Sequence, residues 1–234
     1  MRSRIIAIPI VAALGAMTAG SSAPAAEPAK PDKEGWIALF DAKKGLEGWH
    51  ADRKEGSHWQ ATEDGLLYNA QSGGANLLSD MQSMDHELHV EFKVPPNGNS
   101  GVYIQGRYEV QVGDSSRLKE PHKSMCGAIY SRIAPATIVP GQNPNEWQAF
   151  DIQFRSARLG DDGKVARKAR ITVVHTTALN TEKPNRVVII DNAELEGPTG
   201  GAVDEKEGTP GPLKLQGDHT VVWYRNIKHR PITK

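Results

Sequence analysis

The chain has 234 residues, with 28 basic and 28 acidic side chains and a formal net charge of zero. A nucleic-acid-binding surface needs a basic excess, so this balance gives no reason to expect a nucleic-acid partner. Hydrophobic residues make up 38% of the chain and charged residues 24%, which fits a globular domain with its own core rather than a membrane protein. The single cysteine, Cys126, excludes an intrachain disulfide, so the fold has to be stable through its core alone.

The N-terminal residues have the pattern of a secretory signal peptide. Arg2 and Arg4 precede an apolar run that is shorter than the roughly 20 residues of a membrane span. Small residues follow this run and end in an Ala-Ala pair, which is typical of a cleavage site. We therefore expect no membrane span and a periplasmic or secreted protein, with a cleaved signal peptide over residues 1–26, a flexible leader over 27–34 and one domain over 35–230.

From Trp36 onward the chain consists of short segments of period-2 alternation separated by turns, with no long apolar repeat of helical period. In residues 86–94, four apolar side chains alternate with polar ones before two prolines end the segment. The tetrapeptide 161–164 is typical of a hairpin turn. Many short strands of this kind favour a sandwich or barrel, and we expect strands at His86–Val94, Gly101–Val112, Ala149–Arg155, Ala169–Val174, Val187–Asn192 and Val221–Ile227.

The segment Gly101–Val112 is the most informative, because its polar side chains are not an ordinary solvated mixture. We expect one strand whose apolar residues face the core. Its other face then carries an aromatic ring, two amides, a guanidinium and a carboxylate, namely Tyr103, Gln105, Arg107, Glu109 and Gln111. Aromatic rings stack on sugar rings, while amides, guanidinium groups and carboxylates hydrogen-bond sugar hydroxyls. The row indicates a carbohydrate partner, and an ordinary wet sheet face is the alternative.

Further polar residues extend this hypothesis. Asp114 follows the predicted strand and would pair with Glu109 only if a bulge intervened. Asp151, on the polar face of a later strand, would meet Arg107 or Glu109 if the two strands shared a sheet, although a cross-strand ion pair is the simpler interpretation. His219 lies in a Gly-marked loop, and histidine is a natural proton acceptor near neutral pH. No HExxH-like spacing occurs, so the sequence pattern does not support a metal site. A divalent metal stays open only because Asp114, Glu109 and His219 would supply ligands if they converged.

Five motifs follow one another along the chain. They read GWIALFDAKKGLEGW at 35–49, NSGVYIQGRYEVQV at 99–112, CGAIY at 126–130, NEWQAFDI at 145–152, and GPLKLQGDH at 211–219 with YRNI at 224–227. In this order, over roughly residues 35–227, the chain resembles the 3-keto-disaccharide hydrolase domain family, formerly DUF1080. One departure is the loop 176–186, which is longer than the short turn of family members, so the resemblance does not extend to substrate contacts there.

The resemblance implies an all-β, concanavalin A-like (laminin-G-like) jelly-roll sandwich that cleaves glycosides already oxidised to a ketone at C3. A C3 ketone acidifies the C2 hydrogen, so a base would form an enolate, the group at C1 would leave by elimination, and water would complete net hydrolysis. On this interpretation His219 is the base, with Glu109 as the alternative, and Arg107 or Arg225 stabilises the enolate. The expected substrate-binding residues are Tyr103, Gln105, Gln111, Asp114, Asp151 and Arg225.

Three other interpretations stay open. A two-carboxylate glycosidase would pair Glu109 with Asp114 or Asp151 and would not depend on the ketone. A carbohydrate-binding domain without catalysis would use the same fold and the same polar row. An adhesion domain for protein partners is a weaker alternative, because the polar row fits sugars better than it fits a protein surface.

Overall fold

The computed structural model describes residues 30–53 and 55–233, so the expected signal peptide and residues 27–29 of the expected leader lie outside the described residues. In those two ranges the chain is built from β-strands, and the single regular helical turn is the 3-10 helix η1 (Ala42–Lys44). No helix in this part of the chain is long and apolar enough to cross a membrane. The expected all-β class is confirmed.

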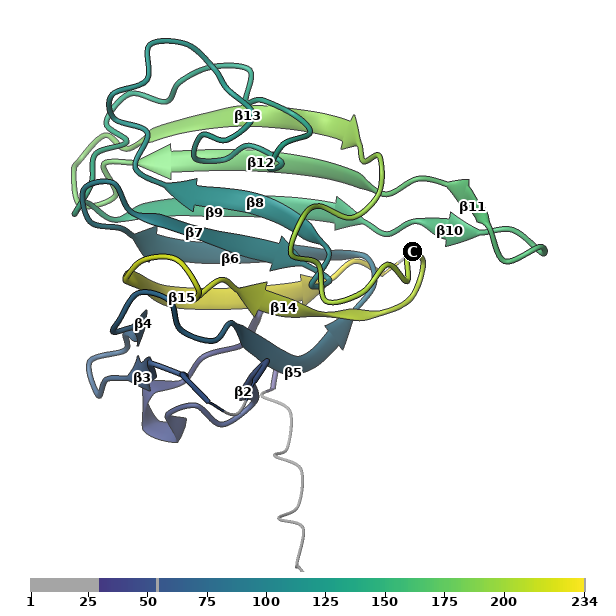
Figure 1. Cartoon of the computed structure of the whole chain (residues 1–234), viewed down its shortest axis with the longest axis horizontal. Helices are drawn as coiled ribbons and strands as arrows, with labels where there is room; N and C mark the ends of the chain where they lie inside the picture. The colour runs from purple at the N-terminus through teal and green to yellow at the C-terminus, as the bar shows by residue number, and fades with distance from the viewer. Residues whose placement is uncertain (1–29, 54, 234) are drawn as a thin grey trace, which may run out of the picture.

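Two antiparallel sheets pack face to face as a sandwich (Figure 1). The first has the strand order β13-β12-β9-β6-β15-β4-β3, with β1 also paired to β15, and comprises β1 (Ile37–Ala38), β3 (Trp59–Ala61), β4 (Leu67–Asn69), β6 (His86–Lys93), β9 (Gln148–Arg155), β12 (Arg170–Thr177), β13 (Asn185–Glu194) and β15 (Val222–Pro231). The second has the order β2-β5-β14-β7-β8 and comprises β2 (Trp49–Ala51), β5 (Leu77–Ser83), β7 (Asn99–Ile104), β8 (Tyr108–Gly113) and β14 (Gly211–Leu215). We call them the eight-stranded and the five-stranded sheet.

The hydrophobic core fills the space between the sheets, because one face of each major strand is apolar. β6 alternates buried and half-buried residues along its length, as its sequence predicts. Phe92 of β6 and Phe150 of β9 lie fully buried with ring centroids 4.6 Å apart. From the five-stranded sheet, Val102 and Val110 close the core. Burial of each such side chain stabilises the fold by roughly 1.5–3 kcal/mol.

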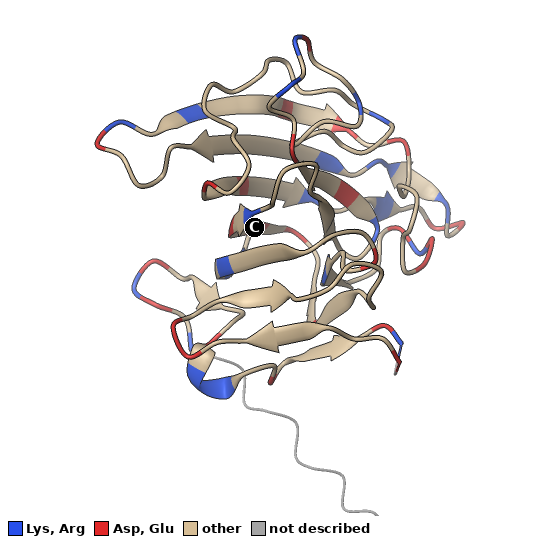
Figure 2. Ribbon diagram, turned by 60° about the vertical axis from the view of Figure 1, so that its left-hand side comes forward, with Lys and Arg blue, Asp and Glu red and all other residues tan. Residues whose placement is uncertain are grey.

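The connection between β9 and β12 also follows the sequence prediction. Its residues form a small hairpin, β10 (Arg158–Leu159) and β11 (Val165–Arg167), that projects from the side of the sandwich (Figure 1). The turn of this hairpin contains Asp161, Asp162 and Gly163, and β9 and β12 are antiparallel neighbours in the sheet. Charged residues lie mostly in loops of this kind and at strand ends (Figure 2).

The predicted single strand over Gly101–Val112 is wrong, because the segment is a hairpin of β7 and β8. The chain reverses at Gln105 and Gly106, whose φ angles are 54° and 66°, in the left-handed region that a strand does not use. A three-residue turn keeps odd-numbered residues on one face of both strands. Tyr103 and Glu109 therefore share a face as expected, but they do so as direct cross-strand partners.

The turn position removes two side chains from the predicted polar row. Arg107 is 1% exposed, and its guanidinium donates to the Asp204 carboxylate at 2.6 Å and to the Thr209 carbonyl at 2.9 Å. The Gln105 amide donates to the Ser83 carbonyl at 2.8 Å. Both residues hold the hairpin turn against neighbouring segments, and Arg107 fixes the loop between β13 and β14, residues 195–210. We call this the 195–210 loop.

The hypothesis that Asp151 shares a sheet with Glu109 is also wrong. Asp151 and Arg225 lie on β9 and β15 of the eight-stranded sheet. Asp151 contacts His89 Nδ1 at 2.6 Å, and Arg225 donates to Glu91 at 2.6 Å. Burial opposes the charged imidazole, yet hydrogen bonds to Asp151 and Glu91 raise the pKa of His89 to about 9. The cross-strand ion pair named as the simpler interpretation of Asp151 is what the structure shows.

Candidate functional site

A row of side chains crosses the outer face of the five-stranded sheet, because direct partners in antiparallel strands lie side by side. Glu109 of β8 pairs with Tyr103 of β7, and Tyr103 pairs with Lys214 of β14. Lys214 pairs in turn with Leu78 of β5, and Leu78 with His50 of β2. The register thus sets a carboxylate, a phenol and an ammonium group next to one another on the face opposite the core.

A second, parallel row lies two residues further along each strand. It contains Gln111, which pairs with Gly101, and Gln216, whose backbone N–H donates to the Gly101 carbonyl at 2.9 Å. Asn76 and Asp52 complete it, and their side chains hydrogen-bond at 2.6 Å. Gln216 is 8% exposed, and its side-chain oxygen is buried with no hydrogen-bond partner in the described protein. An unpaired buried amide oxygen is costly, so Gln216 is a residue whose side chain calls for a further hydrogen-bond donor.

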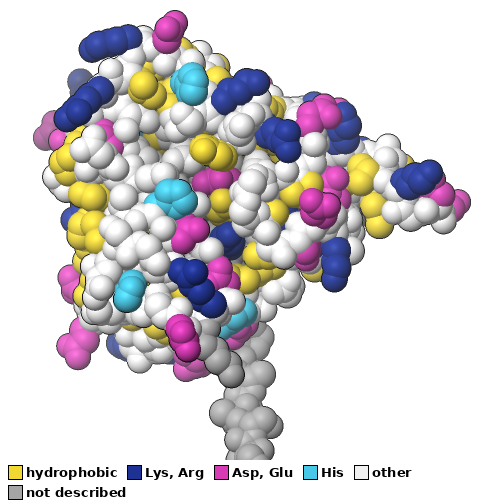
Figure 3. Space-filling model, in the orientation of Figure 1, with side chains coloured by type: hydrophobic (Ala, Val, Ile, Leu, Met, Phe, Trp, Pro, Cys, Tyr) yellow, Lys and Arg dark blue, Asp and Glu magenta, His cyan; other side chains and the backbone are white. Residues whose placement is uncertain are grey.

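A cavity of about 490 Å³ opens over part of the two rows, and Glu109 and Gln111 are not among its lining residues. Tyr103, whose hydroxyl donates to Glu109, is the lining residue that adjoins that carboxylate. Figure 3 views this face and shows acidic, basic and histidine side chains gathered around a hollow near its middle. Residues 201–203 of the 195–210 loop form one wall. The polar lining residues are His50, Asp52, Asn76, Tyr103, Lys214, Gln216 and Asp218.

Glu109 is the most perturbed acid of this face. Its Oε2 accepts from the Tyr103 hydroxyl at 2.8 Å, its Oε1 lies over Gly101 where any Cβ would collide with it, and only 3% of the residue is exposed. Burial raises the pKa of Glu109 from 4.5 to about 7, against the Tyr103 hydrogen bond and the charges of Lys214 and His219. A carboxyl that exchanges its proton near neutral pH is suited to general base catalysis.

Lys214 supplies a positive charge beside this carboxyl. Its Nζ donates to the Gly201 carbonyl at 2.6 Å and lies 4.3 Å from the centroid of the Tyr103 ring. Burial lowers the pKa of Lys214, while the charges of Asp52, Asp218 and Glu109 act in the opposite direction. A cation held in place by the Gly201 carbonyl and the Tyr103 ring is positioned to stabilise negative charge that develops on a substrate.

His219 lies at the rim, in the loop that leads into β15. Its Nδ1 is 2.6 Å from the Asp218 carboxylate, and nearly half of each side chain is exposed. The charge of His219 acts on Glu109, so the two residues lie within electrostatic range of each other. The structure thus brings together His219, Glu109 and Tyr103, three of the residues predicted from the sequence.

The other predicted site residues lie outside this group or at its edge. Gln111 is in the second row, where its amide donates to Asn99 at 2.7 Å. Asp114 accepts from the backbone N–H groups of Asn97 and Ser116, which fixes a turn and lowers its pKa. Gln105, Arg107, Asp151 and Arg225 are held by the contacts described above.

Sequence reasoning found only Tyr103 among the seven polar lining residues and missed the other six, which include Lys214 and Gln216. A signal was available, because Lys214 and Gln216 alternate with Leu213 and Leu215 in one short strand. Among the described residues, no group of three or more His, Cys, Asp and Glu side chains is arranged to hold a metal ion.

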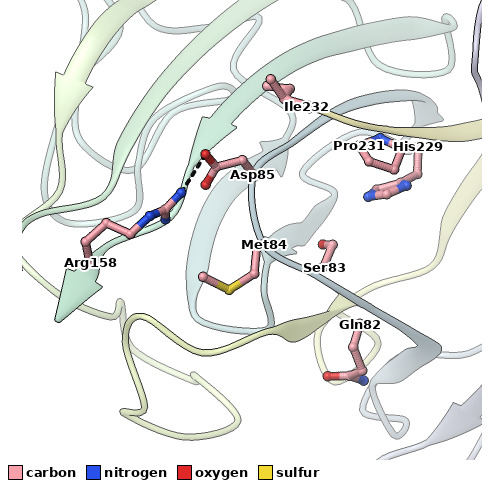
Figure 4. A pocket seen from close by; sticks show the side chains of 8 residues that line it. All are labelled: Gln82, Ser83, Met84, Asp85, Arg158, His229, Pro231 and Ile232. Atoms are coloured by element: carbon pink, nitrogen blue, oxygen red, sulfur yellow. Dashed lines mark hydrogen bonds and ion pairs between the residues drawn. The ribbon is translucent and has the colours of Figure 1, made fainter. Parts of the chain in front are cut away.

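A second cavity, of about 320 Å³, lies near the end of β5 (Figure 4). Its one carboxylate, Asp85, is paired with Arg158 at 2.7 Å. His229 is 4% exposed and both of its ring nitrogens are buried without a partner. Burial lowers the pKa of His229 to about 4, and the nearby His86 adds to this effect. The cavity lacks a poised acid or base, so we assign the candidate site to the larger one.

Comparison with known proteins identifies the family of the chain. The sequence profile of the family described as the 3-keto-alpha-glucoside-1,2-lyase-like domain matches residues 35–230, and the chain belongs to this family. A curated relative, the 3-keto-disaccharide hydrolase of Bacteroides thetaiotaomicron, is 27% identical over 141 residues, which are 56% of this chain and 46% of the relative. The chain therefore matches about half the length of that relative. The resemblance inferred from the motifs is confirmed.

Solved structures show the same architecture. A candidate glycosyl hydrolase from Parabacteroides distasonis superposes with a TM-score of 0.68 at 25% identity, over 92% of this chain and 95% of that one. A second candidate glycosyl hydrolase from the same species gives a TM-score of 0.58 at 14% identity, over 86% and 95% of the two chains. At this identity the second likeness shows the fold alone.

The contact between Glu109 and Gly101 can be tested by Gly101→Ala. The added Cβ would overlap Glu109 Oε1, so the carboxylate has to leave its position. We expect glycoside cleavage to fall by at least about tenfold, since a small displacement of a reacting group lowers the rate of reaction strongly. Gly200→Ala is the matched control, because a Cβ there meets no atom within 4 Å. Equal turnover in both variants, with both folded by circular dichroism, would contradict the assignment.

Acid stability tests the burial of His229. Its pKa is about 4 in the folded state and 6.5 as the ordinary value, so the unfolded chain binds this proton first as the pH falls. The contribution of the neutral His229 side chain to the free energy of unfolding is therefore complete above pH 6.5, and it is lost as the pH falls from 6.5 to about 4. Between pH 7 and 4, we expect wild type to lose about 1 to 3 kcal/mol more unfolding free energy than His229→Leu. Urea titrations measure this difference, His122→Leu is the exposed control, and parallel curves for wild type and His229→Leu would refute the account.

Proposed function

We propose that this protein cleaves 3-keto-glycosides in the cavity on the outer face of the five-stranded sheet, with Glu109 as the base that removes the C2 proton. The observation that carries the proposal is the buried carboxyl of Glu109, with a pKa raised to about 7 by burial, in one row with Tyr103 and, on the far side of Tyr103, the ammonium group of Lys214. The N-terminal pattern supports action in the periplasm or outside the cell.

The proposed reaction has two stages. Glu109 takes the proton from C2, and the electrons of that bond form the enolate with the C3 oxygen. The enolate then collapses, C1 and C2 become doubly bonded, and the bond from C1 to the leaving oxygen breaks. The leaving oxygen takes one proton and departs as an alcohol. Water adds to C1, a proton returns to C2, and the sum is hydrolysis.

Each step has a group in the structure that supports it. Lys214, held by the Gly201 carbonyl and the Tyr103 ring, offers a positive charge to the developing enolate. His219, at the rim with Asp218, is the proposed donor to the leaving oxygen. The unpaired amide oxygen of Gln216 accepts from a substrate hydroxyl. The cavity of about 490 Å³ falls within the roughly 300–1,000 Å³ of small-molecule sites.

The assignment of roles differs from the sequence expectation. His219 was expected as base, with Glu109 as the alternative. Burial gives Glu109 a pKa near the working pH, whereas His219 is exposed at the rim. Arg107 has its guanidinium committed to Asp204 and Thr209, so we transfer its enolate-stabilising role to Lys214.

A comparison of two substrates tests the proposal. The purified protein is offered a 3-keto-glucoside and the matching unoxidised glucoside, and product formation is followed by chromatography. We expect turnover of the ketone alone, because the C2 hydrogen of the unoxidised sugar is not acidic. Equal turnover of both would indicate a two-carboxylate glycosidase. Binding without any product would indicate a carbohydrate-binding domain. Either result overturns the proposal.

The role of Glu109 as base predicts a pH profile and a mutant phenotype. Only the ionised carboxylate accepts a proton, so kcat/KM should rise with pH and level off above about 7. Glu109→Gln keeps the size of the side chain but removes the base, and we expect a loss of about 10²- to 10⁴-fold. Asp161→Asn, in the exposed turn between β10 and β11, is the control for loss of a carboxylate. A Glu109→Gln variant with wild-type activity would disprove the assignment.

A further inference from the structure

The segment 125–133 follows the outer edge of β8 and extends the five-stranded sheet. The Gln111 N–H donates to the Ala128 carbonyl at 2.9 Å, and the Tyr130 N–H donates to the Glu109 carbonyl at 3.1 Å. Val110 and Ile129 form an antiparallel bridge between these two bonds. By this register Tyr130 is the cross-strand neighbour of Glu109.

The register also decides which way the Tyr130 side chain points. Val110 and Ile129 are partners, and both are buried in the core between the sheets. Tyr130 is the first residue of the turn that follows, its N–H bond holds it opposite Glu109, and its exposure places its side chain on the face away from the core. Side chains of directly opposed residues have Cβ atoms about 4.5–5.5 Å apart. Tyr130 therefore continues the row of Glu109, Tyr103 and Lys214 on the side of Glu109 away from the cavity.

Tyr130 is exposed although its backbone is firmly held. It is 39% exposed, while Ile129 and Ile133 on either side of the turn bridge each other. Ser131 has a φ of 61°, and its N–H donates to the Lys123 carbonyl at 2.9 Å. Arg132 donates to the Pro198 carbonyl at 3.2 Å, which ties this turn to the 195–210 loop. An aromatic ring presented to solvent on a fixed turn, next to the proposed base, is placed to meet a ligand.

We propose that Tyr130 forms the subsite for the leaving group and gives the enzyme a preference for substrates whose leaving group is a ring. The inference rests on the proposed function. In this proposal the keto sugar occupies the cavity lined by Tyr103 and Lys214, with C2 directed past Tyr103 toward Glu109, which lies just outside the lining. C1 adjoins C2, so its substituent emerges past Glu109, where the ring of Tyr130 lies. Aromatic faces stack on the apolar faces of sugar rings and on aryl groups, and a methyl group offers them little area.

The experiment compares two substrates in three proteins. A 3-keto-disaccharide with glucose as the leaving group and methyl 3-keto-glucoside are assayed with wild type, Tyr130→Phe and Tyr130→Ala. Because each variant is compared with wild type on the same substrate, differences in leaving-group reactivity cancel. We expect Tyr130→Ala to lower kcat/KM for the disaccharide about 3- to 10-fold, and to leave the methyl glucoside unchanged. Tyr130→Phe keeps the ring and should retain wild-type selectivity.

Each other outcome has a separate meaning. An equal fall for both substrates would show that Tyr130 positions Glu109 rather than the leaving group, and it overturns the subsite. No fall for either substrate also overturns the subsite and leaves the proposed function intact. Wild type that cleaves neither ketone refutes the proposed function, and the subsite is refuted with it. Thermal unfolding of the Tyr130→Ala variant verifies that it is folded under assay conditions.

Discussion

The candidate site depends on one constraint, the withdrawal of the Glu109 carboxylate from water. Gly101 lacks a side chain, so the carboxylate can lie against the sheet, where Tyr103 supplies a hydrogen bond. Burial destabilises the charged carboxylate by more than the Tyr103 hydrogen bond and the nearby positive charges stabilise it. The pKa of Glu109 therefore rises to about 7. The same carboxyl in open water would be ionised near neutral pH but would be too weak a base for carbon acid chemistry.

The rest of the fold can be understood as support for this arrangement. The hairpin of β7 and β8 sets Tyr103 opposite Glu109, and β14 adds Lys214 on the other side of Tyr103. The 195–210 loop closes the cavity wall and is tied to the hairpin by Arg107 and by the backbone bond from Val203 to Gly106. Arg107 thus acts on the site through structure, because a buried guanidinium with its donors already satisfied has none left for a substrate.

The sequence predicted the fold class and three residues that the structure groups at the candidate site, namely Tyr103, Glu109 and His219, for reasons that particular residues make clear. Alternation placed the β6 and β9 side chains correctly, because one buried face demands a period of two. The same alternation hid the turn at Gln105 and Gly106, since a three-residue turn preserves odd and even positions. The assignment of Asp151 and Arg225 to one sheet or the other depends on strand order, which a local pattern does not contain. The alternation within β14 was enough to predict that Lys214 lies on the polar face of a strand. Its place next to Tyr103 depends on strand pairing, which the sequence pattern does not contain.

The central claim is tested most directly by measuring the protonation of Glu109 itself, independently of any substrate. Protein labelled with ¹³C at the glutamate carboxyl carbon is titrated by NMR, and the Glu109 signal is assigned by its absence in Glu109→Gln. The account predicts a midpoint near pH 7. A midpoint near the ordinary 4.5 would show that the carboxyl is solvated and would contradict the assignment of Glu109 as the base.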